Sequence, residues 1–210
     1  MSKTTSITVS KSNYNYSDSG SIKSGEMRVG DQYDENNQTS AGKYIGYFYL
    51  PLYDLENKGD IGKLLQVKLS IPTYNSTSGY NSCYARIDYV GTTIANTSLW
   101  RLGSDNDTIH LSEGKTTSLT TTESTTLSNF RDIIKNSVAG TQHWFRLRRT
   151  SGIGAIINGN ITVTFTYDKG VASYVCVNGS WVETTPYVCV NGAWNECQSY
   201  YCKDGVWCPT

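Results

Sequence analysis

The sequence predicts an all-β protein: a β-sandwich of the jelly-roll type with one short helix over residues 1–168, followed by an array of three small β-hairpins over residues 169–210. Three observations support this prediction. The chain is rich in tyrosine and threonine, which favour strands. Short runs in which apolar and polar residues alternate recur through the first domain. The tail contains a threefold repeat built around Asn-Gly or Asp-Gly pairs.

The first domain is predicted to contain many short strands. Residues 7–16 are expected to form a weak strand in a polar arm, and the clearest strand is residues 65–71, where apolar and polar residues alternate strictly. That period of two indicates a sheet with one face on a core. Residues 115–126 are nearly all threonine and serine, which fits either an exposed strand or a loop. Further strands are expected at residues 27–30, 44–50, 85–89, 98–102, 108–111, 145–148 and 161–167.

One helix is predicted near the end of the first domain. Ser128 can cap its first turn, because a serine hydroxyl accepts a hydrogen bond from a free backbone N–H there. Gly140 is placed to end the helix. The apolar residues that follow Ser128 at helical spacing are Phe130, Ile133, Ile134 and Val138.

Each copy of the tail repeat is predicted to be a β-hairpin, because Asn-Gly and Asp-Gly favour the type I′ turn of two-residue loops. This turn would place the cysteine of each copy opposite its tryptophan, which gives the pairs Cys176–Trp181, Cys189–Trp194 and Cys202–Trp207. The repeated aromatic residues are the candidate site: they either pack between copies or form a platform on which sugar rings stack. These residues are Tyr174, Tyr187, Tyr200, Trp181, Trp194 and Trp207.

Five of the six cysteines lie in the tail, whereas Cys83 stands alone in the first domain and is predicted to be a small buried apolar residue. The tail cysteines are candidates for disulfides, which suit a segment too small to build a core. They are Cys176, Cys189, Cys197, Cys202 and Cys208. A zinc site formed by the last four is the alternative, although no Cys-x-x-Cys pair is present. Because five is odd, at least one tail thiol is expected to stay free or to pair between chains.

The charge balance argues against nucleic acid as a partner. The chain has 18 basic and 18 acidic residues, and binding to phosphates needs a basic excess. We interpret Arg146, Arg148 and Arg149 as a solvent-exposed strand face. No apolar run is long enough to span a membrane and the N-terminus has no apolar core of a secretory signal, so neither a membrane partner nor export through a signal peptide is expected.

No motif for catalysis is present, so we assign no catalytic residue, cofactor or metal. His110 and His143 lie outside any catalytic motif. Asp105 and Asp107 are close in sequence, but their surroundings indicate a turn, with a Ca²⁺ site as the alternative.

Two resemblances add to these predictions. Residues 27–30, 44–52 and 65–71, with residues 127–135 leading to 145–147, resemble the DNRLRE-type jelly-roll modules, which are carbohydrate-binding-module-like β-sandwiches of surface and extracellular proteins. The tail resembles the Tyr-x-x-x-Asn-Gly-x-Trp repeats at the C-termini of structural proteins from tailed phages and prophages of Gram-positive bacteria. Such repeats often carry an aromatic residue where Cys176 and Cys189 stand here.

Together the resemblances imply a non-enzymatic structural protein of a phage virion: a fibre, head-decoration or tail-tip component. The expected partners are other virion proteins and further copies of this chain in a homo-oligomer, with glycans of the host surface as an additional candidate. Such a protein is assembled in the host cytoplasm and becomes extracellular after lysis. One alternative is a carbohydrate-binding module of a bacterial surface or secreted protein. The second is a glycan-degrading enzyme, for which no pair of carboxylates can be named.

Overall fold

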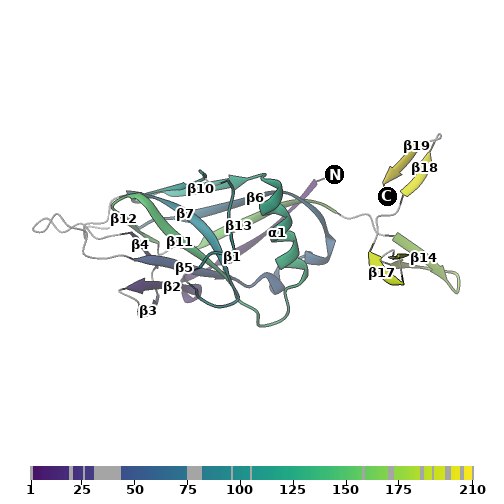
Figure 1. Cartoon of the computed structure of the whole chain (residues 1–210), viewed down its shortest axis with the longest axis horizontal. Coiled ribbons are helices and arrows are strands. Elements are labelled where there is room, and N and C mark those ends of the chain that lie inside the picture. The colour runs from purple at the N-terminus through teal and green to yellow at the C-terminus, as the bar shows by residue number, and fades with distance from the viewer. Residues whose placement is uncertain are drawn as a thin grey trace, which may run out of the picture. The chain divides into compact units, whose positions relative to one another are not determined.

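The computed structural model of the chain describes residues 2–18, 21–25, 27–30, 44–74, 82–95, 97–104, 106–157, 159–169, 173–184, 187–190, 192–196, 200–203 and 206–209. It divides into two compact units, Met1–Asp168 and Lys169–Thr210 (Figure 1). The first unit is a β-sandwich with one α-helix, and the second consists of β-hairpins. The all-β fold class predicted from the sequence is therefore confirmed.

A four-stranded sheet and a seven-stranded sheet form the sandwich. The four-stranded sheet has the order β1-β13-β6-β10, and the seven-stranded sheet has the order β3-β2-β5-β11-β7-β8, with β9 also paired to β7. The first sheet comprises β1 (Ser2–Val9), β6 (Ile61–Pro72), β10 (Thr116–Thr121) and β13 (Ile161–Lys169). The second comprises β2 (Tyr14–Asp18), β3 (Ser21–Ser24), β5 (Ile45–Leu50), β7 (Ser82–Gly91), β8 (Trp100–Arg101), β9 (Ile109–Ser112) and β11 (His143–Gly152). A small third sheet pairs β4 (Met27–Gly30) with β12 (Gly154–Ile157).

The N-terminal segment belongs to both sheets, so the prediction of one weak strand in a polar arm was wrong. Strand β1 pairs with β13, a short 3-10 turn over Lys11–Asn13 follows, and β2 then pairs with β5. Val9 and Tyr14, on either side of this turn, are fully buried. The Tyr14 hydroxyl lies 2.9 Å from the Val9 carbonyl and 2.7 Å from that of Gly159. The crossing is stable because these buried groups satisfy one another, and burial raises the pKa of Tyr14 to about 12.

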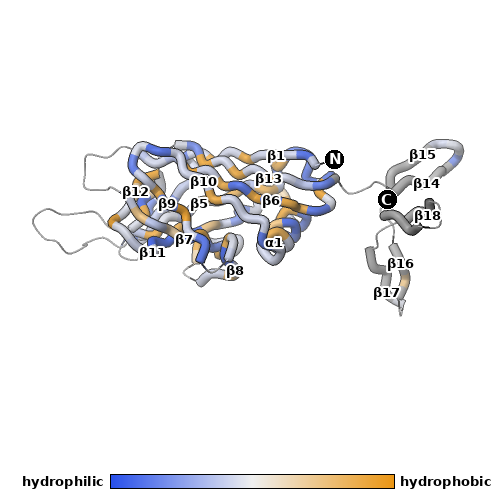
Figure 2. The backbone as a smooth tube through the Cα atoms, turned by 90° about the horizontal axis from the view of Figure 1, so that it is seen from above, coloured by the Kyte–Doolittle hydropathy of each residue, from blue (hydrophilic) through white to orange (hydrophobic). Residues whose placement is uncertain are grey.

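Aromatic rings fill the space between the sheets. Phe145 of β11 stacks on Phe48 of β5, with ring centroids 5.5 Å apart, and on Phe130 of the helix at 5.6 Å. Phe130 also meets Phe165 of β13 edge-on at 5.7 Å. This row of rings connects the two sheets through the helix. Apolar and polar colours alternate along the strands around it (Figure 2), as expected for strands that bury one face.

The helix is α1 (Ser124–Lys135), and its cap lies five residues before the predicted cap Ser128, which is inside the helix. Its N-cap is Glu123, whose two carboxylate oxygens accept hydrogen bonds from the backbone N–H groups of Thr125 at 2.8 Å and Thr126 at 2.6 Å. A hydrogen bond with the side chain of Thr126, together with these two backbone bonds, stabilises the ionised form and lowers the pKa of Glu123 to about 2. The start of the helix could not be predicted from apolar periodicity, because the first turn contains only serine and threonine before Leu127.

The predicted apolar face of the helix is correct in its centre and wrong at its end. Phe130 and Ile134 are buried and Ile133 packs against the core, whereas the side chain of Val138 is 63% exposed. The helix ends at Lys135, so Val138 lies beyond it. Gly140 has φ +80°, but it belongs to the loop that follows.

Strand β6 confirms the predicted alternation from Val67 to Ile71, since Val67, Leu69 and Ile71 are buried and Lys68 is exposed. The prediction was wrong at its first residue, because Leu65 is only half-buried and Leu64 is buried instead. The threonine-rich stretch at residues 115–126 resolves into β10, an edge strand on β6, and the first turn of α1. An exposed edge strand suits threonine because its β-branched side chain fits a pleated surface while its hydroxyl faces water.

The tail forms the three predicted hairpins, with the predicted registers. Strands β14 (Ser173–Val177) and β15 (Ser180–Thr184) pair Cys176 with Trp181, β16 (Tyr187–Val190) and β17 (Ala193–Glu196) pair Cys189 with Trp194, and β18 (Tyr200–Lys203) and β19 (Val206–Pro209) pair Cys202 with Trp207. In the first turn Asn178 has φ 52° and Gly179 has φ 80°. Both values are positive, as a type I′ turn requires, so local turn chemistry sets the register.

Candidate functional site

The outer face of the seven-stranded sheet, opposite the core, carries a group of charged side chains. Cys83, Ala85, Ile87 and Tyr89 of β7 all belong to the core. Because side chains alternate along a strand, the residues between them project from the outer face. The same reasoning applies to β11, where Phe145 and Leu147 point inward. We use the name arginine face for the outward residues Arg86, Asp88, Arg101, Arg146 and Arg148.

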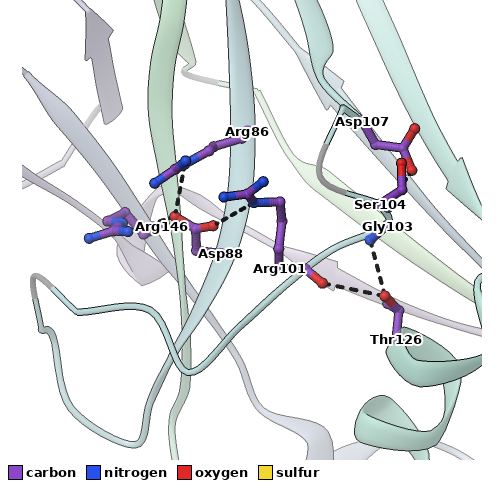
Figure 3. A network of polar contacts seen from close by, with 8 residues as sticks. All are labelled: Arg86, Asp88, Arg101, Gly103, Ser104, Asp107, Thr126 and Arg146. Carbon is purple, nitrogen blue, oxygen red and sulfur yellow. Dashed lines mark hydrogen bonds and ion pairs between the residues drawn. The ribbon is translucent and has the colours of Figure 1, made fainter.

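The first row of the arginine face crosses three strands with one carboxylate at its centre. Asp88 lies directly opposite Arg146 of β11 on one side and Arg101 of β8 on the other. Asp88 is fully buried, and its Oδ2 accepts a hydrogen bond of 2.6 Å from Nη2 of Arg146, which is itself 3% exposed. The Nε of Arg101 lies 3.5 Å from Oδ1 (Figure 3).

The row is also tied to the helix. The backbone carbonyl of Arg101 accepts a hydrogen bond of 3.3 Å from the hydroxyl of Thr126 in α1, and the N–H of Gly103 donates to the same hydroxyl at 3.1 Å (Figure 3). Trp100, the other residue of β8, points inward and lies 5.0 Å from the Phe130 ring. The short strand that carries Arg101 is therefore held from both sides.

The second row places two cations opposite each other. Arg86 and Arg148 are directly paired across β7 and β11. The Nε of Arg86 lies 3.4 Å from Oδ2 of Asp88, whereas Arg148 is exposed and forms no hydrogen bond or ion pair with the described part of the chain. Like charges directly opposite each other destabilise a sheet. An anion bound between the two guanidinium groups would offset their repulsion.

Two exposed rings continue the face beyond these arginines. Tyr84 of β7 is paired with His110 of β9, and their rings stack with centroids 4.4 Å apart and an interplanar angle of 10°. Tyr84 is 45% exposed and His110 is exposed as well. The opposite end of the face is covered, because Tyr47, Val90 and Trp144 form a second apolar cluster there. The accessible part of the face is therefore the end with Tyr84, Arg86 and Arg148.

The charge on the arginine face is strongly positive. Four guanidinium groups and one carboxylate give a formal charge of 4 − 1 = +3 for its five residues. The whole chain has no net charge, so this is a local concentration. Asp88 contacts Arg146, Arg101 and Arg86, and these contacts hold the three guanidinium groups in position on the sheet.

The structure corrects one interpretation and adds residues that the sequence did not indicate. Arg146 was interpreted as solvent-exposed together with Arg148 and Arg149, but Arg146 is buried against Asp88. A buried arginine is stable here because the ion pair is short and enclosed. Asp88 lies 58 positions from Arg146, so no local pattern could reveal their contact.

The tail residues predicted as a site are brought into hairpins, but their ring contacts are not described. The side chains of the six candidate tyrosines and tryptophans lie outside the described part of the structure, as do those of Cys176, Cys197, Cys202 and Cys208. Cys189 is described: it is exposed and its thiol is free. Both the aromatic platform and the disulfides stay predictions.

Other candidates from the sequence have structural roles. Cys83 is buried, as predicted, and burial raises the pKa of its thiol to about 12. His143 is buried with its Nδ1 3.0 Å from the Tyr89 hydroxyl, and this burial lowers its pKa. Asp107 accepts a hydrogen bond of 2.7 Å from the N–H of Ser104 in a turn, while Asp105 lies outside the described residues.

The described ranges contain neither a candidate metal site nor a candidate membrane-spanning helix. No three of the described histidine, cysteine, aspartate and glutamate residues form a group that could hold a metal ion. Among the described helices, none combines the length and apolar character needed to cross a bilayer.

Comparison with known proteins gives no family. No protein-family description matches the chain, and no curated protein matches it. One solved structure to which the chain is similar is "CBM35 from Cellvibrio japonicus Abf62". That similarity has a TM-score of 0.35 and 11% sequence identity, and it covers 79% of this chain and 99% of the other. Similarity at this level gives no information on the ligand.

Proposed function

We propose that this protein is a non-catalytic binding module that holds an anionic polysaccharide on its arginine face. The observation that carries the proposal is the direct pairing of Arg86 with Arg148 on adjacent strands. The one carboxylate of the arginine face, that of Asp88, already contacts Arg86 and Arg146. A guanidinium group presents a planar set of N–H donors that matches a carboxylate or sulfate group. Two such groups on adjacent strands can bind one anionic substituent together.

The neighbouring rings favour a sugar over a nucleic acid. Tyr84 and His110 lie on the same face, and aromatic side chains provide apolar contact area together with a polar atom. Nucleic-acid binding proteins usually extend a basic surface over many phosphates, whereas the net charge of this chain is zero. A short basic patch beside exposed rings fits a polymer that combines hydroxyl groups with spaced negative charges.

Affinity electrophoresis tests this proposal with matched polymers. We expect the full chain to be retarded by polygalacturonate and to migrate freely in its methyl-esterified form, which has the same backbone without the charges. The variant Arg86→Gln/Arg148→Gln should lose at least tenfold in affinity, since a hydrogen bond to a charged group contributes about 1.5–3 kcal/mol.

The control is Lys3→Gln/Lys68→Gln, which removes the same charge from exposed positions on the four-stranded sheet. It should bind as the wild type does. Equal losses in both double variants would show a general charge effect and would refute the proposed site. Preferential binding to a DNA duplex would refute the assignment to polysaccharides.

A second candidate function comes from the tail, and it is compatible with the first. We propose that the module is a component of a phage particle, with other virion proteins and further copies of itself as partners. The supporting observation is that three hairpins with the same cysteine–tryptophan register follow one another along the tail. Mass spectrometry of purified particles should detect this chain in stoichiometric amount, and its absence from them would refute the particle role.

A further inference from the structure

A groove lies between the beginning of β6, in the four-stranded sheet, and one face of α1. It is an open groove of about 650 Å³, within the range of small-ligand sites. None of the five residues of the arginine face lines it. The groove is therefore a separate feature of the first unit.

The groove exists because two neighbouring elements differ in length. Strand β10 pairs with β6 only as far as Thr121, which lies opposite Val67. Strand β6 extends back to Ile61, so its first residues have no β10 neighbour. The chain turns into α1 at this point, and Ser124, Leu127, Ser128 and Arg131 of the helix line the groove. Their spacing of i, i+3, i+4 and i+7 places them on one helix face.

The groove combines an apolar floor with a polar rim. Leu64 and Leu127 are buried, with 3% and 9% exposure, and Leu65 beside them is half-buried. The hydroxyl-bearing residues Ser124 and Ser128 are exposed at the rim. This distribution is typical of a site that receives a small molecule with both an apolar and a polar part.

The charged groups of the groove are both cationic. Lys63 comes from β6 and Arg131 from α1, and no aspartate or glutamate lines the groove. The Nε of Arg131 is buried and makes no hydrogen bond with any described residue. Buried polar atoms usually have a partner. The buried Nε of Arg131 has no such partner, and Lys63 lines the same groove, so the site favours an anionic ligand.

The free N–H groups of the helix do not provide this site. The carboxylate of Glu123 already accepts hydrogen bonds from Thr125 and Thr126. Recognition of an anion therefore depends on the side chains of Lys63 and Arg131.

We propose that this groove binds a small organic anion, in which a carboxylate or phosphate group lies between Lys63 and Arg131 and a compact apolar body covers Leu64 and Leu127. The hydroxyl groups at the rim supply further hydrogen bonds to the anion. This site is independent of the arginine face, so either can fail without the other.

Nuclear magnetic resonance titration of the ¹⁵N-labelled full chain tests the proposal with four probes. Benzoate and phenyl phosphate carry both features, inorganic phosphate carries the charge alone, and benzyl alcohol carries the ring alone. We expect benzoate, phenyl phosphate or both to shift the amide signals of residues 62–65 and 122–131. The response to each anion shows whether carboxylate or phosphate is preferred. Inorganic phosphate and benzyl alcohol should bind at least tenfold more weakly than the better of the two.

Variants separate a specific site from general attraction. Lys63→Gln/Arg131→Gln should weaken binding by about tenfold or more, whereas Lys3→Gln/Lys68→Gln and Arg86→Gln/Arg148→Gln should leave it unchanged. Matching amide spectra of the unliganded variants would show that each is folded. The proposal is overturned by the absence of localised shifts with both organic anions, by equal binding of benzyl alcohol, by equal binding of inorganic phosphate, or by unchanged affinity in the Lys63→Gln/Arg131→Gln variant.

Discussion

The buried carboxylate of Asp88 holds the arginine face together, so its removal is the most informative perturbation of the fold. In Asp88→Asn the side chain keeps its size and one acceptor oxygen but loses its charge. Arg146, buried against it at 2.6 Å, would then lack its carboxylate. Arg86 and Arg101 would lose the same neighbour.

The expected loss can be worked out from the exposure of each pair. Removing one partner of a buried ion pair costs about 3–5 kcal/mol, and the Arg146–Asp88 pair is buried, with side-chain exposures of 4% and 0%. The contacts of Arg86 at 3.4 Å and Arg101 at 3.5 Å involve side chains that are 26% and 23% exposed, so each adds about 0–1 kcal/mol. We expect Asp88→Asn to lower the free energy of unfolding by at least about 3 kcal/mol.

Urea unfolding followed by circular dichroism measures this loss. The matched control is Asp18→Asn, which breaks the Lys23–Asp18 pair at 2.7 Å with side chains 50% and 26% exposed, and it should cost about 1 kcal/mol or less. The double variant Asp88→Leu/Arg146→Met should recover most of the loss, since an apolar replacement of a buried pair is often neutral. A loss for Asp88→Asn no larger than that for Asp18→Asn would show that the Asp88 carboxylate does not hold the arginine face together.

Three further predictions concern single positions. Glu123→Gln should lower the free energy of unfolding by about 1 kcal/mol at neutral pH. Because the pKa of Glu123 falls from 4.5 to about 2 on folding, this contribution is complete above pH 4.5 and disappears as the pH falls through 2. A difference in unfolding free energy between the two proteins that persists below pH 2 would contradict the capping role of Glu123. Gly46→Ala should lower the free energy of unfolding by about 1–3 kcal/mol, because its Cβ would lie 2.5 Å from the nearest side-chain carbon. The control Gly59→Ala, with open space around it, should leave the melting temperature nearly unchanged. Equal melting temperatures of the two variants would argue against tight packing around Gly46. Iodoacetamide at pH 8 should label the exposed thiol of Cys189 and spare the buried Cys83, whose pKa is about 12. Labelling of Cys83 in the native protein, detected by peptide mass spectrometry, would show that this thiol is accessible to solvent.

Local chemistry explains which parts of the fold were predictable. A type I′ turn needs positive φ at two adjacent residues, so Asn178 and Gly179 determine the register of their hairpin without any tertiary contact. The central part of strand β6 was predictable because its buried residues, Val67, Leu69 and Ile71, alternate with polar ones. The start of α1 was not, since its cap is a glutamate in a run of serine and threonine.

The candidate site was less predictable because long-range pairing creates it. Alternation places Asp88 on the polar side of β7, which by itself indicates exposure to solvent. It is buried because Arg146 and Arg101 flank it from β11 and β8. The groove likewise depends on the position at which β10 stops pairing with β6 and on the helix face that replaces it. Neither arrangement has a local motif, although two arginines on predicted strands, Arg86 and Arg148, would have justified a search for their partners.

The most direct measurement of the proposed function is an amide-shift map of the ¹⁵N-labelled full chain titrated with a short galacturonate oligomer. We predict shifts concentrated in β7, β9 and β11 around Tyr84, Arg86 and Arg148, with the four-stranded sheet unaffected. The methyl-esterified oligomer should cause no such shifts. Saturating oligomer that leaves these strands unchanged, or that shifts signals in residues 173–209 alone, would contradict the assignment of ligand binding to the arginine face.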